Sequence, residues 1–164
     1  MSALQIKSMR SGLWWMLGIF LLLSCATTKK TPNYYGPQEY SSLTRDPECI
    51  WVRDSLPIVD DSIKALLLKS PLKDCTFKIY LGCWCSDSRR LIPRFRAIAE
   101  ALSIPPDRMQ YLALDLNKKS PSGMEKDDRI EWVPTVIVYQ EGKEIGRVVE
   151  VAKPNLESVL LGFF

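Results

Sequence analysis

Two cysteines one residue apart stand in the stretch YLGCWCSDSRR, which runs from Tyr80 to Arg90. They are Cys83 and Cys85, and Ser88 follows three residues after the second. A thiolate is a nucleophile, and a pair of thiols can exchange with a disulfide or close into one. The chain contains no histidine, so neither a Cys/His nucleophile nor a Cys/His zinc site can be built. Thiol chemistry is therefore the chemistry open to this stretch.

The residues around the two cysteines predict a strand that leads into a helix. Thr76 to Gly82 is rich in β-branched and aromatic residues and ends at a glycine. Ser86 to Leu102 has apolar residues at helical spacing, with Pro93 inside it as an expected kink or break. Backbone amides and the dipole at a helix N-terminus stabilise a thiolate. Cys85, just before this helix, is therefore the candidate nucleophile.

Cys83 is a second catalytic candidate, as a resolving thiol. Side chains two apart in a strand point to the same face, so Cys83 and Cys85 can lie side by side if the strand ends there. A disulfide between them would close a small, strained ring that is easily reduced. Two other roles stay open for Cys83: filling a small position under the loop, or forming a structural disulfide with Cys75 or Cys49.

Cys49 and Cys75 flank another predicted helix and both fall near predicted strand starts. A disulfide between them would close a loop of about 27 residues and stabilise the fold by about 3–4 kcal/mol. Two buried free thiols are the alternative. A zinc site of four cysteines is disfavoured, because Cys83 and Cys85 are closer than the usual spacer allows. We expect no metal and no cofactor.

The rest of the chain alternates predicted strands and helices. Before the cysteine motif we expect a short strand at Cys49–Val52 and a helix at Asp60–Ser70. After it we expect strands at Gln110–Leu116, Thr135–Tyr139 and Glu144–Glu150, the last two joined by a turn at Glu141 and Gly142, and a closing helix after Pro154. Alternating βαβ units followed by a hairpin predict an α/β fold, with a mixed central sheet and helices on both faces.

The first 24 residues are interpreted as a targeting segment. Lys7 and Arg10 precede an apolar run from Leu13 to Leu23, which is shorter than the about 20 residues that span a bilayer. A small residue just before Cys25 resembles the lipobox of bacterial lipoproteins, in which cleavage leaves the cysteine lipidated. That resemblance implies a membrane anchor of several acyl chains at Cys25. An uncleaved anchor or an ordinary signal peptide is the alternative.

The chain is accordingly divided into a signal peptide at 1–24, a flexible polar tether at 25–46 and a folded domain at 47–164. Without Lys7 and Arg10 the mature chain has 20 basic and 19 acidic residues. This nearly neutral balance does not indicate the excess of positive charge that is typical of a nucleic-acid-binding domain. We expect a monomer that is lipid-anchored in the bacterial cell envelope and faces the periplasm or the cell exterior, where disulfides persist.

Three separated features together resemble the thioredoxin superfamily. A strand runs into WCSDS, in which Trp84 precedes the cysteine at a helix start, and about fifty residues later Val133 and Pro134 open a strand that begins a hairpin. That family places W-C-x-x-C after a strand and a cis-proline on the facing loop. The likeness covers residues 49–164 and implies a thioredoxin-like fold.

The same resemblance assigns roles around Cys85. Trp84, Ser88, Val133 and Pro134 would form the substrate-binding site, with a cis peptide bond before Pro134 and an extended substrate paired to the adjacent backbone. An ordinary trans-proline at a strand start is the alternative. No arginine or threonine stands where a peroxidase would need one.

Two positions depart from the family pattern. Ser88 replaces the second cysteine of W-C-x-x-C, which removes the thiol that would release a mixed disulfide. Ile79 stands where many thioredoxins have a buried acid, so the proton acceptor of the resolving step is also missing. Both changes point away from a standard disulfide reductase.

Two functional hypotheses follow. The first is a membrane-tethered thiol-disulfide oxidoreductase with Cys85 as nucleophile and Cys83 as resolving thiol, whose partners are envelope proteins or extended peptides that carry thiols or disulfides. The second is a redox-inactive module with the same fold that binds a partner or peptide at Pro134. A monothiol role lies between them, in which an external thiol resolves the mixed disulfide on Cys85.

Overall fold

The computed structural model describes residues 36–164, except residues 39, 46, 54 and 55. The predicted signal peptide, the lipidation residue Cys25 and the first part of the predicted tether lie outside the described residues. Every helix in the described part of the chain is too short or too polar to span a bilayer.

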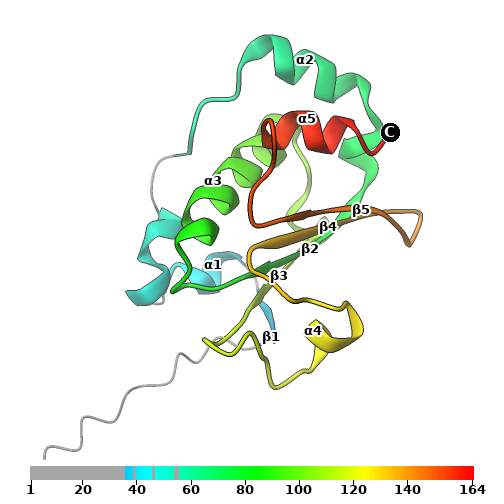
Figure 1. The fold of residues 1–164 in the computed structure, drawn as a ribbon. Coiled ribbons are helices and arrows are strands. Elements are labelled where there is room, and N and C mark those ends of the chain that lie inside the picture. Colours follow the sequence, from blue (N-terminus) through cyan, green and yellow to red (C-terminus); the bar gives the residue numbers. More distant parts are fainter. Residues whose placement is uncertain (1–35, 39, 46, 54–55) are drawn as a thin grey trace, which may run out of the picture. The chain divides into compact units, whose positions relative to one another are not determined.

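A mixed sheet of five strands runs through the described residues, in the order β1-β3-β2-β4-β5 (Figure 1). The central strand β2 (Thr76–Leu81) is parallel to β3 (Met109–Ala113) and antiparallel to β4 (Thr135–Gln140). The outer strands β5 (Lys143–Val149) and β1 (Gly36–Gln38) pair antiparallel with β4 and β3.

Five α-helices and three 3₁₀ helices connect and cover the strands in the described ranges. The α-helices are α1 (Tyr40–Leu43), α2 (Asp61–Lys69), α3 (Ser86–Ala101), α4 (Met124–Asp127) and α5 (Leu156–Leu161). The 3₁₀ helices are η1 (Pro47–Arg53), η2 (Pro71–Asp74) and η3 (Pro106–Arg108). Asp60 and Asn155 accept hydrogen bonds from the first free amides of α2 and α5, which explains where these two helices begin.

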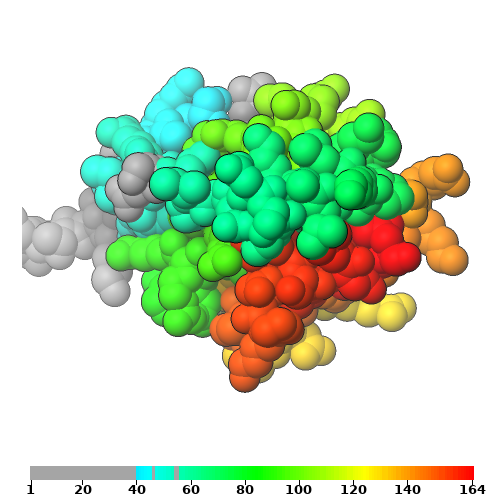
Figure 2. Space-filling view, turned by 90° about the horizontal axis from the view of Figure 1, so that it is seen from above, coloured from blue at the N-terminus to red at the C-terminus, as the bar shows by residue number. Residues whose placement is uncertain are grey.

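The alternation of side chains along the strands divides the core between the two faces of the sheet. Phe77, Ile79 and Leu81 of β2 join the larger core under α2, α3 and α5. Tyr80 belongs to a smaller cluster on the other face, together with Leu112. Figure 1 shows α4 on the side of the sheet opposite α3 and α5, and Figure 2 shows α2 and α5, which contact one another, side by side.

The predicted fold class is confirmed by this topology. The chain passes from β2 through α3 to the parallel β3, and the hairpin of β4 and β5 is followed by α5. The sheet is mixed and helices lie on both of its faces, so the fold is α/β and thioredoxin-like. α3 is one continuous helix that includes Pro93, and the predicted hairpin strands agree with β4 and β5 within one residue.

Two predictions on the N-terminal side are wrong. Cys49–Val52 is part of the 3₁₀ helix η1 rather than a strand, because its buried residues pack against the end of α3 instead of pairing with a sheet edge. The second half of the predicted tether belongs to the domain, since β1 hydrogen-bonds the outer edge of β3 and Leu43 of α1 is fully buried. A short polar strand can cover an open sheet edge without any hydrophobic pattern.

Candidate active site around Cys85

Cys85 stands where the sequence predicted it, at the N-terminus of a long helix. β2 ends at Leu81, and the Cys85 amide donates to the carbonyl of Gly82 at 2.9 Å, which closes a turn over residues 82–85. Cys85 is the N-cap residue of the 16-residue helix α3, and its carbonyl accepts the amide of Arg89 at 3.2 Å. The turn and the helix together aim the Cys85 side chain across the end of the sheet.

The sulfur of Cys85 lies against the start of β4. Its Sγ donates to the carbonyl oxygen of Val133 at 3.2 Å, and the residue is only 8% exposed. The Val133–Pro134 peptide bond is cis, as predicted, and the carbonyl of Pro134 accepts the amide of Glu150 at 2.8 Å. The structure therefore brings Cys85, Val133 and Pro134 together at one end of the sheet.

Trp84 flanks Cys85 and is fixed by two neighbours. Its indole Nε1 donates to the carbonyl of Leu114, just beyond β3, at 3.1 Å. Its ring also lies on Gly82, where an added Cβ would be 2.7 Å from Cε2 of the indole. A glycine is therefore needed at position 82 so that Trp84 can pack on the backbone beside Cys85.

Ser88, the residue at the position of the missing second cysteine, holds the turn. Its side chain is fully buried, and its Oγ accepts the amide of Gly82 at 3.1 Å. Ser88 thus satisfies a buried backbone donor at the end of β2. This contact supports the turn that presents Cys85.

The disulfide pairing differs from the expected Cys49–Cys75 bridge and agrees with the alternative left open for Cys83, a structural disulfide with Cys49. Cys49 is bonded to Cys83, with their Cα atoms 4.7 Å apart, whereas Cys75 is a buried free thiol that donates to the carbonyl of Pro71 at 3.6 Å. Burial and the nearby charge of Asp74 raise the pKa of the Cys75 thiol. The predicted bridge does not form because η1 runs beside the turn after β2, while Cys75 lies before that strand.

Cys83 and Cys85 also do not lie side by side. The strand ends before them, so the strand alternation assumed for residues 83 and 85 does not apply. Cys83 belongs to the core cluster on the face of α3, together with Cys49, whereas Cys85 belongs to the cluster of Tyr80 on the other face. As the structure stands, Cys83 is a disulfide partner and Cys85 is the free thiol at the site.

Trp51 is a site residue that the sequence reasoning missed. Its indole Nε1 donates to the carbonyl of Cys83 at 3.0 Å, and its side chain is buried. Trp51 and Cys49 stand on the same 3₁₀ helix, so η1 holds Cys83 by one covalent bond and one hydrogen bond. Nothing in the run CIWV itself signals this contact, because it depends on a neighbour 32 residues away.

A polar network lies under α4 on the face of the sheet that carries Cys85. Lys78 forms an ion pair with Asp128 at 2.7 Å, and the hydroxyl of Tyr80 donates to the same carboxylate. Burial, followed by the hydrogen bond and charge of Asp128, raises the pKa of Tyr80 far above its ordinary value. Among the described residues no group of three or more acidic, cysteine or histidine side chains could hold a metal ion.

Comparison with known proteins yields structural likenesses only. No protein-family model and no curated protein matches the chain. The thioredoxin of Fasciola hepatica is 17% identical with a TM-score of 0.35, over 46% of this chain and 66% of that one, so the chain spans just under two thirds of that thioredoxin. The thioredoxin pre-protein of Schistosoma mansoni is 19% identical, over 66% and 95% of the two chains, with a TM-score of 0.42. A protein of unknown function from Pseudomonas aeruginosa is 11% identical, over 76% and 82%, with a TM-score of 0.43.

Proposed function

We propose that this protein is a membrane-tethered, thioredoxin-like protein of the bacterial envelope that exchanges thiols with disulfides through Cys85. The observation that carries the proposal is the place of the Cys85 sulfur, at the N-terminus of α3 and 3.2 Å from the carbonyl of Val133. A helix N-terminus stabilises the thiolate that attacks a disulfide. The turn held by Ser88 and Trp84 keeps that sulfur in one position.

The exchange proceeds by two displacements at sulfur. The Cys85 thiolate attacks one sulfur of a substrate disulfide, forms a mixed disulfide with it and releases the other sulfur as a thiolate. A thiolate from a second molecule then attacks the substrate sulfur of the mixed disulfide and releases Cys85 as a thiolate. Cys85 is unchanged at the end, and the substrate has exchanged one thiol partner for another.

An external thiol is assigned to the second displacement because, among the described residues, no second free thiol lies beside Cys85. Ser88 has a hydroxyl where a dithiol enzyme has its resolving thiol, and Cys83 is bonded to Cys49. Cys83 can act as the resolving thiol only after that bond has been reduced. The monothiol cycle is therefore the form of exchange that this arrangement favours.

The proposed substrates are envelope proteins or extended peptides that carry a thiol or a disulfide. In the described part of the chain, the ladder between β2 and β4 ends at Thr135, and the amide of Val133 has no backbone partner. An extended segment that reaches Cys85 can accept a hydrogen bond from this amide, as in β-strand addition. Trp132, which is 50% exposed beside Val133, offers an apolar contact to the same segment.

The test is the formation of a mixed disulfide on Cys85. The full-length protein is incubated with glutathione disulfide or with a peptide disulfide, and the modified cysteine is identified by mass spectrometry. We expect a single adduct on Cys85 that a monothiol reverses, no adduct in Cys85→Ala and an unchanged adduct in Cys75→Ala. If Cys85 stays unmodified in the folded protein both before and after reduction of the Cys49–Cys83 bond, disulfide exchange at this site is refuted.

A redox-inactive binding module is the second candidate, and the burial of Cys85 favours it. Because Cys85 as a residue is only 8% exposed, its sulfur is poorly placed to attack a substrate disulfide unless the turn or a bound segment shifts. Under this alternative, peptides bind the edge at Val133 equally well in the parent and in Cys85→Ala, and no adduct forms. Binding measured with a cysteine-free peptide separates the two candidates, because exchange requires a thiol or disulfide in the ligand.

The membrane anchor is proposed from the sequence around Cys25, which lies outside the described residues. We expect the purified envelope protein to begin at an acylated Cys25 and to partition with the membrane fraction. Cys25→Ser should leave an unlipidated protein, and mass spectrometry of the N-terminal peptide detects the difference. An N-terminal peptide that begins upstream of Cys25 in the mature protein would contradict the lipoprotein assignment.

A further inference from the structure

The 3₁₀ helix η1 joins the turn that presents Cys85 to a distant anchor on the fold. At its C-terminal end, the carbonyl of Val52 accepts the hydroxyl of Tyr40 at 2.8 Å, and Nε of Arg53 donates to the carbonyl of Thr44 at 2.7 Å. These two hydrogen bonds attach η1 to α1 and to the residue that follows it.

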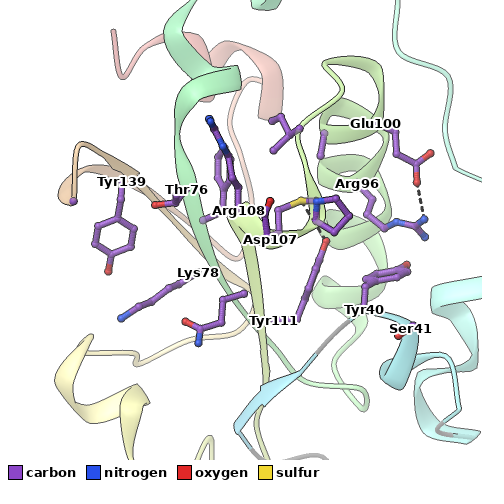
Figure 3. Close-up of a pocket in the computed structure, with 17 residues that line it drawn as sticks. Tyr40, Ser41, Thr76, Lys78, Arg96, Glu100, Asp107, Arg108, Tyr111 and Tyr139 are labelled. Atoms are coloured by element: carbon purple, nitrogen blue, oxygen red, sulfur yellow. Dashed lines mark hydrogen bonds and ion pairs between the residues drawn. The ribbon is translucent and has the colours of Figure 1, made fainter.

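Tyr40 fixes that anchor to the rest of the domain. The guanidinium of Arg96 on α3 lies 3.9 Å from the centre of the Tyr40 ring, and the ring of Tyr111 on β3 lies 5.1 Å from it, centre to centre. Figure 3 shows Tyr40 beside both of these side chains. Because α3 is a 16-residue helix packed on the sheet and β3 pairs with the central strand β2, Tyr40 connects η1 to the core elements of the fold.

The other part of η1 holds Cys83 by two links. Cys49 supplies the disulfide, and Trp51 donates its indole hydrogen bond to the carbonyl of the same residue. Cys83 is a central residue of the turn that the amide of Cys85 and the carbonyl of Gly82 close. Any restraint on Cys83 is therefore a restraint on the position of Cys85.

We propose that η1 is a redox-operated clamp on Cys85. With the Cys49–Cys83 disulfide intact, the turn is held and the Cys85 thiol stays covered, bonded to the carbonyl of Val133. When a dithiol reductant opens the disulfide, η1 holds Cys83 only through the Trp51 hydrogen bond. The turn keeps its contacts with Ser88 and Trp84 but loosens at Cys83, and Cys85 becomes accessible. The clamp makes the state of one cysteine pair control the reactivity of another cysteine.

The reducing step is an ordinary dithiol exchange. One thiolate of the reductant attacks a sulfur of the Cys49–Cys83 bond, forms a mixed disulfide with that cysteine and releases the other cysteine as a thiolate. The second thiolate of the reductant then attacks the reductant's sulfur in the mixed disulfide and releases the first cysteine. The reductant ends as a disulfide, and Cys49 and Cys83 end as thiols, so two electrons and two protons have been transferred. Both cysteines are buried, at 0% and 4% exposure, so we expect the bond to open more slowly than an exposed disulfide.

The test measures the access of a small reagent to Cys85 and needs no disulfide exchange. It deepens the site of the proposed function, but alkylation requires only an accessible thiol, so the clamp and the exchange activity can fail separately. The full-length protein is prepared with the disulfide intact and after reduction by dithiothreitol followed by its removal. Each form is treated with iodoacetamide, and the rate at Cys85 is followed by peptide mass spectrometry over a range of pH.

We expect Cys85 to be alkylated about tenfold faster in the reduced form, the effect of making a local opening more frequent. Cys75, a buried free thiol outside the disulfide, serves as the internal control for global unfolding, and its rate should rise much less than that of Cys85. Recording the rate against pH separates a change in access from a change in the thiolate fraction of Cys85.

Two sets of variants test the links one at a time. Cys49→Ala combined with Cys83→Ala should show the fast rate without any reductant, whereas Cys75→Ala should keep the slow rate. Trp51→Phe keeps the ring but loses the hydrogen bond to Cys83, and we expect Cys85 to react about threefold faster with the disulfide intact. If the cysteine double variant does not fold, Trp51→Phe by itself tests the proposal.

Rates at Cys85 that agree within about twofold between the oxidised and reduced forms would overturn the clamp, as would a slower rate on reduction. An equal acceleration at Cys75 also overturns it, because unfolding of the less stable reduced domain, and not a loosened turn, would then expose both thiols.

Discussion

The hydroxyl oxygen of Ser88 lies 3.1 Å from the backbone nitrogen of Gly82, whose hydrogen bond it accepts. Ser88 stands one turn into α3, at the position of the second cysteine in W-C-x-x-C, and it is completely buried. Ser88 therefore leaves no gap in the site, because its hydroxyl holds the end of β2 to α3.

Replacement of Ser88 by cysteine should create a dithiol site. In Ser88→Cys the new thiol can attack a mixed disulfide on Cys85 and release the substrate, so we expect insulin reduction with dithiothreitol to accelerate about tenfold. The poorer acceptor should also lower the free energy of unfolding by about 1 kcal/mol, since the Gly82 amide loses a good partner. Ser86→Cys is the matched control, because it adds a thiol at the start of α3 at the wrong spacing. An equal gain in both variants would argue against a resolving role for position 88.

Opening of the Cys49–Cys83 bond should destabilise the domain by a large amount. The cysteines are 34 residues apart, and the chain-entropy model assigns about 4 kcal/mol to such a loop. Urea unfolding of the oxidised and reduced protein measures the difference, and Cys75→Ala, which removes only a buried sulfur, should lose about 1 kcal/mol. A difference below that of Cys75→Ala would mean that the reduced chain keeps the same restraint by packing alone.

The ion pair between Arg94 and Glu157 should stabilise the contact of α3 with α5. Arg94 donates from Nε and a terminal nitrogen to both carboxylate oxygens, at 3.0 and 3.1 Å, and the side chain of Glu157 is only 5% exposed. Arg94→Met leaves that buried carboxylate without its cation, and we expect a loss of about 1–3 kcal/mol in the free energy of unfolding. Arg90→Met, one turn earlier and 71% exposed in its pair with Asp87, should lose less than about 0.5 kcal/mol. Equal losses in chemical denaturation would contradict this assignment.

The free energy of unfolding should fall at alkaline pH, because Tyr80 and Lys78 in the network under α4 lose their protons there. Burial and then Asp128 raise the pKa of Tyr80 above its ordinary value of 10.0. Burial lowers the pKa of Lys78, but the hydrogen bond and charge of Asp128 outweigh it and raise that pKa above 10.5. Groups with a raised folded-state pKa contribute stability that is complete below the unfolded pKa and is lost as the pH rises through the folded one.

Thermal unfolding followed from pH 9 to 12 measures this loss, which we expect to begin near pH 10, the ordinary pKa of tyrosine. Tyr80→Phe removes the titrating hydroxyl, so its curve should be flatter above that pH. Asp128→Asn should also flatten the curve, since it removes the charge that raises both pKa values. A parent protein whose melting temperature is constant over this range would contradict the network's contribution.

The local elements of the site were predictable from the sequence because each has its own pattern. The β-branched run before the cysteines forms β2, the helical spacing after them forms α3, and Cys85 at their junction is the N-cap residue. The turn at Glu141 and Gly142 separates the two strands of the hairpin. In each of these cases the residues that determine the structure are neighbours in the chain, whereas the cis bond before Pro134 was implied by the family resemblance.

The pairing of the cysteines was decided by the tertiary structure. Four cysteines allow three complete pairings, and local pattern favours none of them, because the choice depends on which segments the fold brings together. η1 has an apolar run that is also typical of a strand, and only its packing against α3 places Cys49 and Trp51 beside Cys83. β1 has no pattern of its own and exists through the open edge of β3. The sequence alone determined the position of Cys85 at the junction of β2 and α3 through short-range preferences. The covering of Cys85 and the links to Cys83 result from contacts across about thirty residues or more, which no local period encodes.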